Sequence, residues 1–300
     1  MKHQTHVSFI GAGEIGGAIS SLVLHSGVSV EQWDADPKKV PNQKSLKDVV
    51  SNADVLFFCV PSWILRVAVK PITSFLPKKT LCVFVSKGIE EKTHLYIDQL
   101  AKKILPKNQP FALLSGPMLA EELIAGKGGS ALVASNNRKT FVTLQSIFSC
   151  TGLRLEFTND VRSVAVSGVL KNIYAISLGI AAGLNWGDNR KGWLCASVIS
   201  EMSQILKMQK TNSLFAYRQS GLADLIATGF SQYSSNQTLG RELVEKSHCE
   251  RKSEGCISLP SLVKQIGVKR MKMLPVLSSL DRIIIKGKDT KKEFETLFCG

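Results

Sequence analysis

The chain has 300 residues, of which 44% are hydrophobic, and this is enough for two globular domains with buried cores. Its net charge is +14. The cations are spread along the chain without interleaved aromatic residues for base stacking, which argues against nucleic acid. We expect most of the charge to be solvated surface, part of which helps to attract anions. The seven cysteines are scattered and form no C-x-x-C pair, as is typical of a reduced cytoplasmic protein.

Neither end of the chain predicts a targeting signal or a metal site. The N-terminal sequence MKHQTHVSFIGAG has no long apolar segment and no cleavage pattern, so we expect no secretory signal. Near the other end, His248, Cys249 and Cys256 lack a fourth ligand, and we expect no metal. An apolar stretch over residues 164–184 is interrupted by Lys171, so we expect a buried helix and no membrane span.

In the first half of the chain, short β-rich runs alternate with helical ones. The predicted strands are Val7–Ile10, Val28–Trp33, Asp54–Val60, Leu81–Val85, Phe111–Leu114 and Ser130–Ala134, and the predicted helices include Ile15–His25 and Leu95–Ile104. Such alternation predicts a parallel, doubly wound sheet. From about residue 160 helical patterns replace the strands, and Asn159 or Asp160 is a suitable N-cap there. We predict an α/β domain over residues 1–160 and an all-α domain over residues 161–300.

A glycine-rich turn follows the first predicted strand and opens the first helix, which begins with Glu14 and Ile15. Its glycines, Gly11, Gly13 and Gly16, have the G-x-G-x-x-G spacing. The first permits a tight turn, the second lets a pyrophosphate approach the backbone, and the third permits close helix packing. The helix N-terminus then attracts the phosphates. In this context the motif predicts a Rossmann-type dinucleotide site.

The acidic residue Asp34 ends the second predicted strand, eighteen residues after Gly16. A carboxylate at this place accepts hydrogen bonds from the adenosine ribose and repels a 2′-phosphate. Two neighbouring cations, Lys38 and Lys39, weaken that repulsion. We therefore expect NAD as the cofactor, with NADP as the alternative.

One lysine, Lys171, interrupts a helical stretch that is apolar nearly all round. A buried ammonium is costly unless a partner compensates its charge. The sequence alone leaves open a second interpretation, in which the lysine extends along a half-exposed face. A desolvated lysine has a lowered pKa and can donate a proton near neutral pH.

Several further stretches resemble, in the same order, the NAD(P)-dependent glycerol-3-phosphate dehydrogenases. With the glycine turn they cover nearly the whole chain. They are VSKGIE (85–90), LSGPMLAEEL (114–123), LKNIYAISLGIAAGL (170–184) with GDNRKG (187–192), GLADLIATGFSQYSSNQTLG (221–240) and SEGCIS (253–258).

The resemblance implies a Rossmann domain followed by a helical domain, with the active site between them. The implied reaction is reversible hydride transfer between NADH and dihydroxyacetone phosphate, which gives sn-glycerol 3-phosphate for glycerophospholipid metabolism. Reducing a ketone requires a proton for the developing alkoxide. In the family the lysine of the L-K-N motif supplies it, and here that residue is Lys171.

The same resemblance implies the other residues of the site. The catalytic group is Lys171 with Lys87 and Asp224. The expected substrate contacts are Lys87, Gly116, Asn172, Asp224, Thr228, Ser234, Ser235 and Asn236. The expected cofactor contacts are Gly11, Gly13, Glu14, Ile15, Gly16, Asp34, Lys87, Ala120 and Glu254.

The chain departs from the family pattern on the substrate side. Ser235 stands where the family has an arginine that clamps the substrate phosphate, and serine cannot form that bidentate pair. Met118 replaces a hydroxyl residue after the S-G-P motif, and the segment after Asp34 is shorter than in the family. Arg218 and Lys191 are candidates for a replacement cation.

Two other functions remain open from the sequence. One is a related NAD-dependent dehydrogenase that acts on a different small ketone or 2-hydroxy compound, as the change at Ser235 suggests. The other is a non-catalytic dinucleotide-binding sensor, which would have no need to retain Lys87, Lys171 and Asp224 together. The sequence does not determine the oligomeric state, for which a homodimer is one candidate.

Overall fold

The computed structural model describes residues 4–24, 26–246 and 251–300. Contacts between residues divide the chain into two units. Unit 1 comprises the chain up to Lys87 together with Leu95–Val164, and unit 2 comprises Gly88–His94 together with Ala165–Gly300. The domain limit predicted at residue 160 stays a prediction.

Unit 1 contains a seven-stranded sheet in the order β2-β1-β3-β4-β5-β6-β7. Its strands are β1 (His6–Ile10), β2 (Ser29–Trp33), β3 (Val55–Phe58), β4 (Leu81–Phe84), β5 (Phe111–Ser115), β6 (Gly129–Ala134) and β7 (Leu153–Thr158). The first six were predicted from the sequence. The sheet is parallel, as predicted, except at one pairing, where β6 runs antiparallel to β5.

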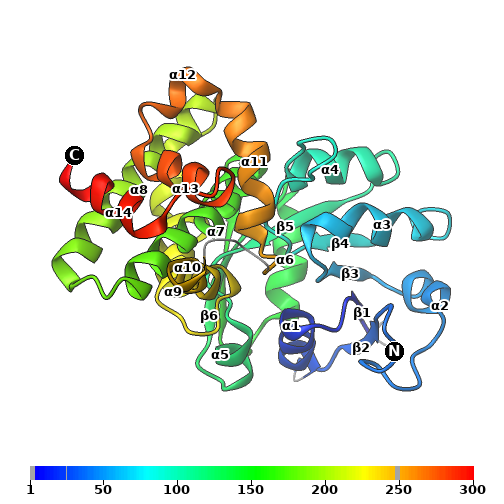
Figure 1. Cartoon of the computed structure of the whole chain (residues 1–300). Coiled ribbons are helices and arrows are strands. Elements are labelled where there is room, and N and C mark those ends of the chain that lie inside the picture. The colour runs from blue at the N-terminus through cyan, green and yellow to red at the C-terminus, as the bar shows by residue number, and fades with distance from the viewer. Residues whose placement is uncertain (1–3, 25, 247–250) are drawn as a thin grey trace. The chain divides into compact units, whose positions relative to one another are not determined.

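Helices cover both faces of this sheet, as expected for a doubly wound fold. They are α1 (Glu14–Leu24), α2 (Leu46–Ser51), α3 (Leu65–Val69), α4 (Ile97–Ile104), α5 (Ala120–Ile124) and α6 (Arg138–Ile147), with 3-10 turns at Ser62–Ile64 and Lys70–Ile72. Figure 1 shows α1 and α5 on one side of the strands and α3 and α4 on the other.

The sheet is apolar on both faces because helices bury both of them. On one face the rings of Phe9 and Phe57, which are paired in the β1–β3 register, stack with centroids 4.8 Å apart. On the opposite face Phe58 and Phe84 stack in the same way at 4.9 Å. Each of these rings is fully buried, and such burial stabilises a fold by roughly 1.5–3 kcal/mol per side chain.

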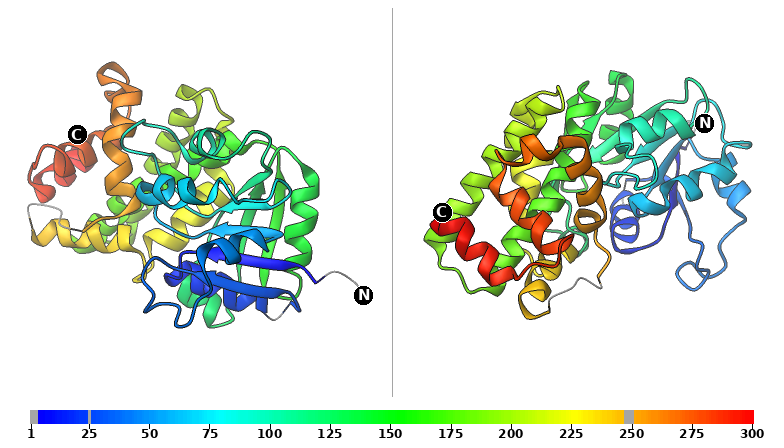
Figure 2. Two further views of the ribbon diagram at one scale, coloured as in Figure 1. Left: turned by 90° about the vertical axis from the view of Figure 1, so that its right-hand side faces the viewer. Right: turned by 45° about the horizontal axis from the view of Figure 1, so that its top comes forward.

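Unit 2 is built from helices, as the sequence predicted, and Figure 2 shows them from two further directions. They are α7 (Val161–Gly183), whose first turn lies in unit 1, and α8 (Asp188–Met208), α9 (Asp224–Gly229), α10 (Ser235–Glu245), α11 (Glu254–Ile266), α12 (Val268–Met271), α13 (Pro275–Ile284) and α14 (Thr290–Cys299). A 3-10 turn at Ser213–Tyr217 and a π-helical turn at Gln219–Ala223 join α8 to α9.

The longest helix, α7, begins at a capped turn and is buried along its length. Asp160 accepts the backbone N–H of Ser163 at 3.0 Å, as expected for an N-cap. By length and composition this helix could cross a membrane, but its apolar side chains are enclosed by the protein. That burial is typical of the core helix of a globular fold.

Glycines bring the backbones of α7 and α10 into contact. A Cβ atom on Gly179 would lie 2.2 Å from the carbonyl oxygen of Gln237, and one on Gly240 would lie 2.2 Å from that of Ile176. Neither position can hold a larger residue without separating the helices. This approach places the first two turns of α10 beside the C-terminal half of α7.

A buried carboxylate, Glu201 on α8, caps the N-terminus of α13. It accepts the backbone N–H groups of Val276 at 2.6 Å and Leu277 at 3.0 Å, and the hydroxyl of Tyr174 donates to it at 2.7 Å. Burial raises the pKa of Glu201 to about 7 against the opposing effect of these donors. The contact ties α7, α8 and α13 together.

The short segment Gly88–His94 binds to α11 within unit 2. The backbone N–H of Ile89 donates to the hydroxyl of Ser258 at 3.1 Å, and Nδ1 of His94 lies 2.8 Å from the hydroxyl of Ser261. The side chain of Gln265 donates to the carbonyl oxygen of His94 at 2.8 Å. Both ends of the segment are therefore fixed to one helix.

Candidate active site

The glycine-rich turn of unit 1 has the geometry that phosphate binding requires. Gly11 has a φ of +99°, and a Cβ there would lie 2.8 Å from the carbonyl oxygen of Cys59. A Cβ on Gly16 would lie 2.0 Å from the carbonyl oxygen of Gly11, so the helix packs directly on the turn. Beside Gly13 there is open space within 4 Å, where α1 begins at Glu14. This combination of exposed backbone, space and a helix N-terminus fits a pyrophosphate.

The carboxylate of Asp34 is organised by the same turn. It accepts the backbone N–H groups of Ala12 at 2.8 Å and Asp36 at 2.9 Å, and the ammonium of Lys39 lies 3.6 Å away. Burial alone would raise the pKa of Asp34, but these donors outweigh it and hold the pKa below its usual value. The side chain of Gln43 bonds both backbone groups of Asp34, which folds the short following segment back on the strand.

Two predicted site residues of unit 1 meet beyond the ends of β4 and β5. The ammonium of Lys87 donates to the carbonyl oxygen of Gly116 at 3.0 Å. A side chain at Gly116 would collide with the carbonyl oxygen of Ser130 at 2.3 Å, so only glycine fits between these loops. Nearby, Met118 is buried in the hydrophobic core of the unit, and Ala120 opens α5.

In unit 2, Lys171 is buried, and its ammonium contacts Asp224 and Thr228. Its ammonium lies 2.9 Å from the carboxylate of Asp224 and donates to the hydroxyl of Thr228 at 2.9 Å. The hydroxyl of Thr228 in turn donates to Asp224 at 3.0 Å. The side chain of Lys171 is only 8% exposed, so the interpretation of a lysine on a half-exposed face is wrong.

The three groups form a closed triangle that fixes the direction of the ammonium. Asp224 and Thr228 are four residues apart on α9 and therefore share one helix face. The carboxylate compensates the buried positive charge of Lys171, which otherwise would be costly. A positioned, desolvated ammonium of this kind can serve as a proton donor to an alkoxide.

Beside this triangle, Asn172 joins three helices. Its side-chain oxygen accepts from Nδ2 of Asn236 on α10 at 3.1 Å, and Oδ1 of Asn236 accepts the backbone N–H of Gly255 on α11 at 2.9 Å. A Cβ on Gly255 would lie 2.4 Å from the carbonyl oxygen of Asn172. Glu254, a predicted cofactor contact, precedes this glycine at the start of α11. Sequence reasoning gave Gly255 no role, although the E-G pair at a helix start was a usable signal.

The serine that replaces the family arginine lies at the start of α10. Ser234 caps this helix by accepting the backbone N–H of Gln237, whereas Ser235 is exposed. Of the two candidate replacement cations, Arg218 lies over the ring of Phe215 at 5.1 Å. Lys191 lies 3.6 Å from Asp188, one turn earlier on α8.

The predicted residues thus fall into two groups, each assembled within its own unit. Unit 1 holds Gly11, Gly13, Glu14, Ile15, Gly16, Asp34, Lys87, Gly116 and Ala120, and unit 2 holds Lys171, Asn172, Asp224, Thr228, Ser234, Ser235, Asn236 and Glu254. The first group has the features of a dinucleotide site, and the second holds a buried lysine with its counter-ion.

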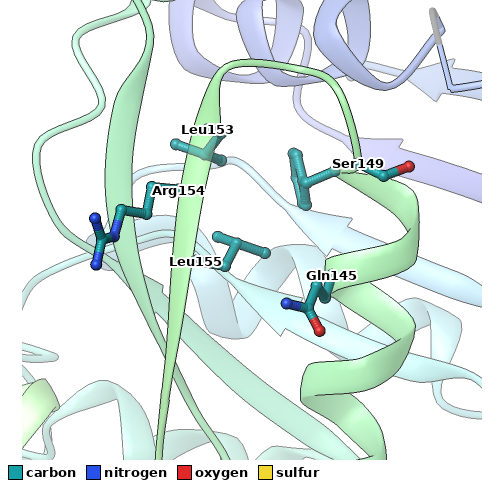
Figure 3. Close-up of a pocket in the computed structure, with 6 residues that line it drawn as sticks. Gln145, Ser149, Leu153, Arg154 and Leu155 are labelled. Carbon is teal, nitrogen blue, oxygen red and sulfur yellow. The ribbon is translucent and has the colours of Figure 1, made fainter.

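A pocket of about 390 Å³ on unit 1 lies between α6 and β7 and contains none of these residues. Figure 3 shows Arg154 directed away from Gln145 and Leu155, as the alternation of a strand requires. Its lining of two leucines, a phenylalanine, a serine, a glutamine and Arg154 provides no carboxylate, imidazole or phosphate-binding turn. We assign it no catalytic role.

The candidate metal ligands His248 and Cys249 lie outside the described residues. Among the residues that the structure describes, no group of three or more His, Cys, Asp and Glu side chains is arranged to hold a metal ion.

Comparisons with known proteins match both units. Residues 37–141 match the family model for the N-terminus of NAD-dependent glycerol-3-phosphate dehydrogenase, and residues 160–295 match that for its C-terminus. A glycerol-3-phosphate dehydrogenase [NAD(P)+] of Fusobacterium nucleatum is 33% identical over 78% of this chain and 77% of its own length. One from Acinetobacter baylyi is 30% identical over 81% of this chain and 73% of its own.

Solved structures share the fold. The crystal structure of glycerol-3-phosphate dehydrogenase from Coxiella burnetii superposes with a TM-score of 0.88 at 21% identity, covering 99% of both chains. A D-mandelate dehydrogenase in a complex with NADH is more distant, with a TM-score of 0.62 at 12% identity, and covers 99% of this chain and 100% of its own. The chain therefore shares the fold of these structures.

Proposed function

The chain belongs to the NAD(P)-dependent glycerol-3-phosphate dehydrogenase family of oxidoreductases, and on that premise we propose how its residues perform the reaction. The substrate pair is dihydroxyacetone phosphate and sn-glycerol 3-phosphate. A bound nicotinamide supplies or accepts the hydride. The observation that carries the proposal is the buried ammonium of Lys171, held at 2.9 Å from both Asp224 and Thr228.

In the direction of reduction, Lys171 donates a proton to the oxygen of the former carbonyl group. Thr228 orients the ammonium by accepting a hydrogen bond from it, and Asp224 compensates its charge. The family resemblance assigns Lys87 of unit 1 as a second cation, and a second positive charge favours the alkoxide that forms during hydride transfer. In the reverse direction Lys171 accepts the proton from the alcohol.

We infer a preference for NADH over NADPH from the ionised carboxylate of Asp34. The lowered pKa of Asp34 means that it keeps its negative charge at neutral pH, where it repels a 2′-phosphate. Fluorescence titration should show tighter binding of NADH, and Asp34→Asn should narrow the difference while retaining an oxygen for the N–H of Ala12. A wild-type protein that binds NADPH more tightly would contradict this inference.

We also infer that the enzyme is cytoplasmic and acts on a small anionic substrate, with a homodimer as the candidate assembly. The reduced cysteines support the compartment. The net charge of +14 supports an anionic substrate. Light scattering on the purified protein tests the dimer, for which a monomeric mass would be the contrary result.

The decisive experiment measures NADH oxidation with a panel of small ketones that includes dihydroxyacetone phosphate and unphosphorylated dihydroxyacetone. We expect the highest kcat/KM for the phosphate ester. The serine at position 235 motivates a second candidate, a dehydrogenase for another ketone or 2-hydroxy compound. A clear preference for an unphosphorylated ketone would favour that candidate.

A further inference from the structure

A short projecting turn in unit 2, the α12 tip, combines cations with exposed aliphatic side chains. We define it as residues 268–273. Val268 is 83% exposed and Met273 is 53% exposed, while Met271 is buried and anchors the turn. The remaining side chains of the tip are the exposed cations Lys269, Arg270 and Lys272. Figure 1 and the left-hand view of Figure 2 both show α12 at the top of the helical unit, where it projects beyond α11.

The surroundings of the α12 tip strengthen its positive charge. The sequence has no acidic residue between Glu254 and Asp281, and none between Glu201 and Asp224. A hydrogen bond of 3.2 Å from Gln209 to Gln265 joins these two stretches. It brings the end of α8 to the end of α11 just before the tip.

Three more exposed cations come from these flanking helix ends. They are Lys207, Lys210 and Lys264. Lys264 lies 3.1 Å from the ring of His94. The exposed acid of the neighbouring segment is Glu91, which is followed directly by Lys92. Within the described part of the chain, no ion pair includes a cation of the tip itself, so its charge faces solvent.

We propose that the α12 tip docks reversibly on the anionic surface of a lipid bilayer. Cations interleaved with exposed aliphatic side chains suit the membrane interface, where apolar groups enter the headgroup region and Lys and Arg lie at the phosphates. Val268 and Met273 are the inserting groups, and Lys269, Arg270 and Lys272 are the phosphate contacts. A nucleic acid would gain nothing from the two aliphatic groups and would find no aromatic ring to stack on.

Purified full-length protein and two kinds of vesicle test the charge in this proposal. We expect co-sedimentation with vesicles of phosphatidylglycerol in phosphatidylcholine, decreasing as salt is added, and none with phosphatidylcholine alone. Each cation near an anionic surface contributes roughly fivefold to the partition coefficient. The triple variant K269Q/R270Q/K272Q should therefore bind about a hundredfold more weakly.

A matched control removes the same net charge elsewhere. Lys78, Lys79 and Lys107 are exposed on unit 1, and K78Q/K79Q/K107Q should keep vesicle binding within about threefold of wild type, since these cations lie outside the tip. Equal losses in the two triple variants would mean that only the total charge matters, and would overturn the proposal.

The aliphatic contribution is tested by V268S/M273S, which leaves every charge in place. We expect about tenfold weaker vesicle binding, because the variant loses most of the apolar area that enters the interface. Unchanged vesicle binding, or tighter binding of wild type to duplex DNA than to the vesicles, would overturn docking on a bilayer. NADH oxidation by each variant, expected at the wild-type rate, verifies that the fold is intact.

Discussion

At the scale of single residues, Lys171 and Asp224 depend on each other for burial. Each carries a charge that would be costly alone, and their side chains are 8% and 3% exposed. The same carboxylate that permits the lysine to be buried also fixes the position of its ammonium. If Lys171 is the proton donor that we propose, stability and catalysis are coupled at this pair, and variants can separate them.

We predict that Lys171→Met lowers kcat by about 10²–10⁴-fold, the usual contribution of a general acid. It should also lower the free energy of unfolding by roughly 3–5 kcal/mol, because Asp224 remains buried without its counter-ion. The double variant K171M/D224N should recover most of the stability and none of the activity. Urea unfolding measures the stability of the two variants, and steady-state kinetics measure their kcat. A Lys171→Met protein that keeps kcat within about tenfold of wild type would contradict the assigned role.

A second residue-scale prediction concerns Ser235, where the family has a phosphate-clamping arginine. Because Ser235 is exposed at the start of α10, an arginine there has room to extend. Ser235→Arg should lower KM for dihydroxyacetone phosphate about tenfold, the factor that about 1.4 kcal/mol supplies, without changing kcat.

Ser235→Gln is the control for this change, because it adds length without charge. It should leave KM near the wild-type value. Kinetics on unphosphorylated dihydroxyacetone distinguish a charge contact with the phosphate from a general effect of the larger side chain, since the charge contact acts only on the phosphate ester. An equal improvement for both ketones would reject the clamp.

At the scale of helices, the α7–α10 contact depends on glycine. Gly240→Ala would place a Cβ 2.2 Å from the carbonyl oxygen of Ile176. Helices forced apart in this way should lose about 1–3 kcal/mol of stability. Asn236, one turn earlier, should also move away from Asn172, so that kcat/KM falls as well.

Gly192 provides the matched control. It lies inside α8, and a Cβ there would meet nothing within 4 Å. Gly192→Ala should therefore raise stability by about 0.5–1 kcal/mol through the lower entropy of the unfolded chain. Urea denaturation of both variants measures the difference. If Gly240→Ala and Gly192→Ala changed the stability by similar amounts, α7 and α10 would not be in close backbone contact.

The capping contact of Glu201 predicts a dependence of stability on pH. The pKa of Glu201 is about 7 in the folded protein, whereas an unperturbed glutamate, as in the unfolded chain, has a pKa of 4.5. Since the folded state binds this proton more tightly than the unfolded state, the associated stabilisation is present below about pH 4.5. It is lost as pH rises through about 7, and amounts to about 3 kcal/mol at most.

Glu201→Gln should remove this pH dependence, because an amide does not titrate. The substitution should also lower the free energy of unfolding at acidic pH by about 1–3 kcal/mol. The reason is that one amide oxygen cannot accept all three hydrogen bonds that converge on the carboxylate. Unfolding by urea at about pH 5 and pH 8 compares the variant with wild type across that window. An equal slope in both proteins would assign the titration to another group.

At the scale of the whole molecule, the sequence predicted what depends on local periodicity and missed what depends on distant partners. Strand positions and the apolar α7 follow from side-chain alternation and helical spacing. β7 was missed because Arg154 and Glu156 give it a polar, solvent-facing side. The antiparallel pairing of β6 needs a long-range arrangement that no local pattern encodes.

The candidate site shows the same division. The glycine turn and Lys171 were recognisable because each belongs to a short, contiguous sequence motif. The E-G pair pointed to the turn at Gly255 but not to its partner, because the amide of Gly255 bonds Asn236, nineteen residues earlier on another helix. Similarly, the cap of α13 joins Glu201 to Val276 across 75 residues, a pairing that composition and spacing do not reveal.

The placement of Gly88–His94 in unit 2 has a consequence for how the protein is made. This segment leaves the ribosome early, yet its partner Ser258 is 169 positions further along the chain. The helical unit cannot be completed until that long loop closes, so the two halves of the gene product cannot mature independently. If the polypeptide were cut at the start of the helical half, that half would lack the segment Gly88–His94, which binds to α11. The separate first half would still carry this segment, but without the helix that it binds.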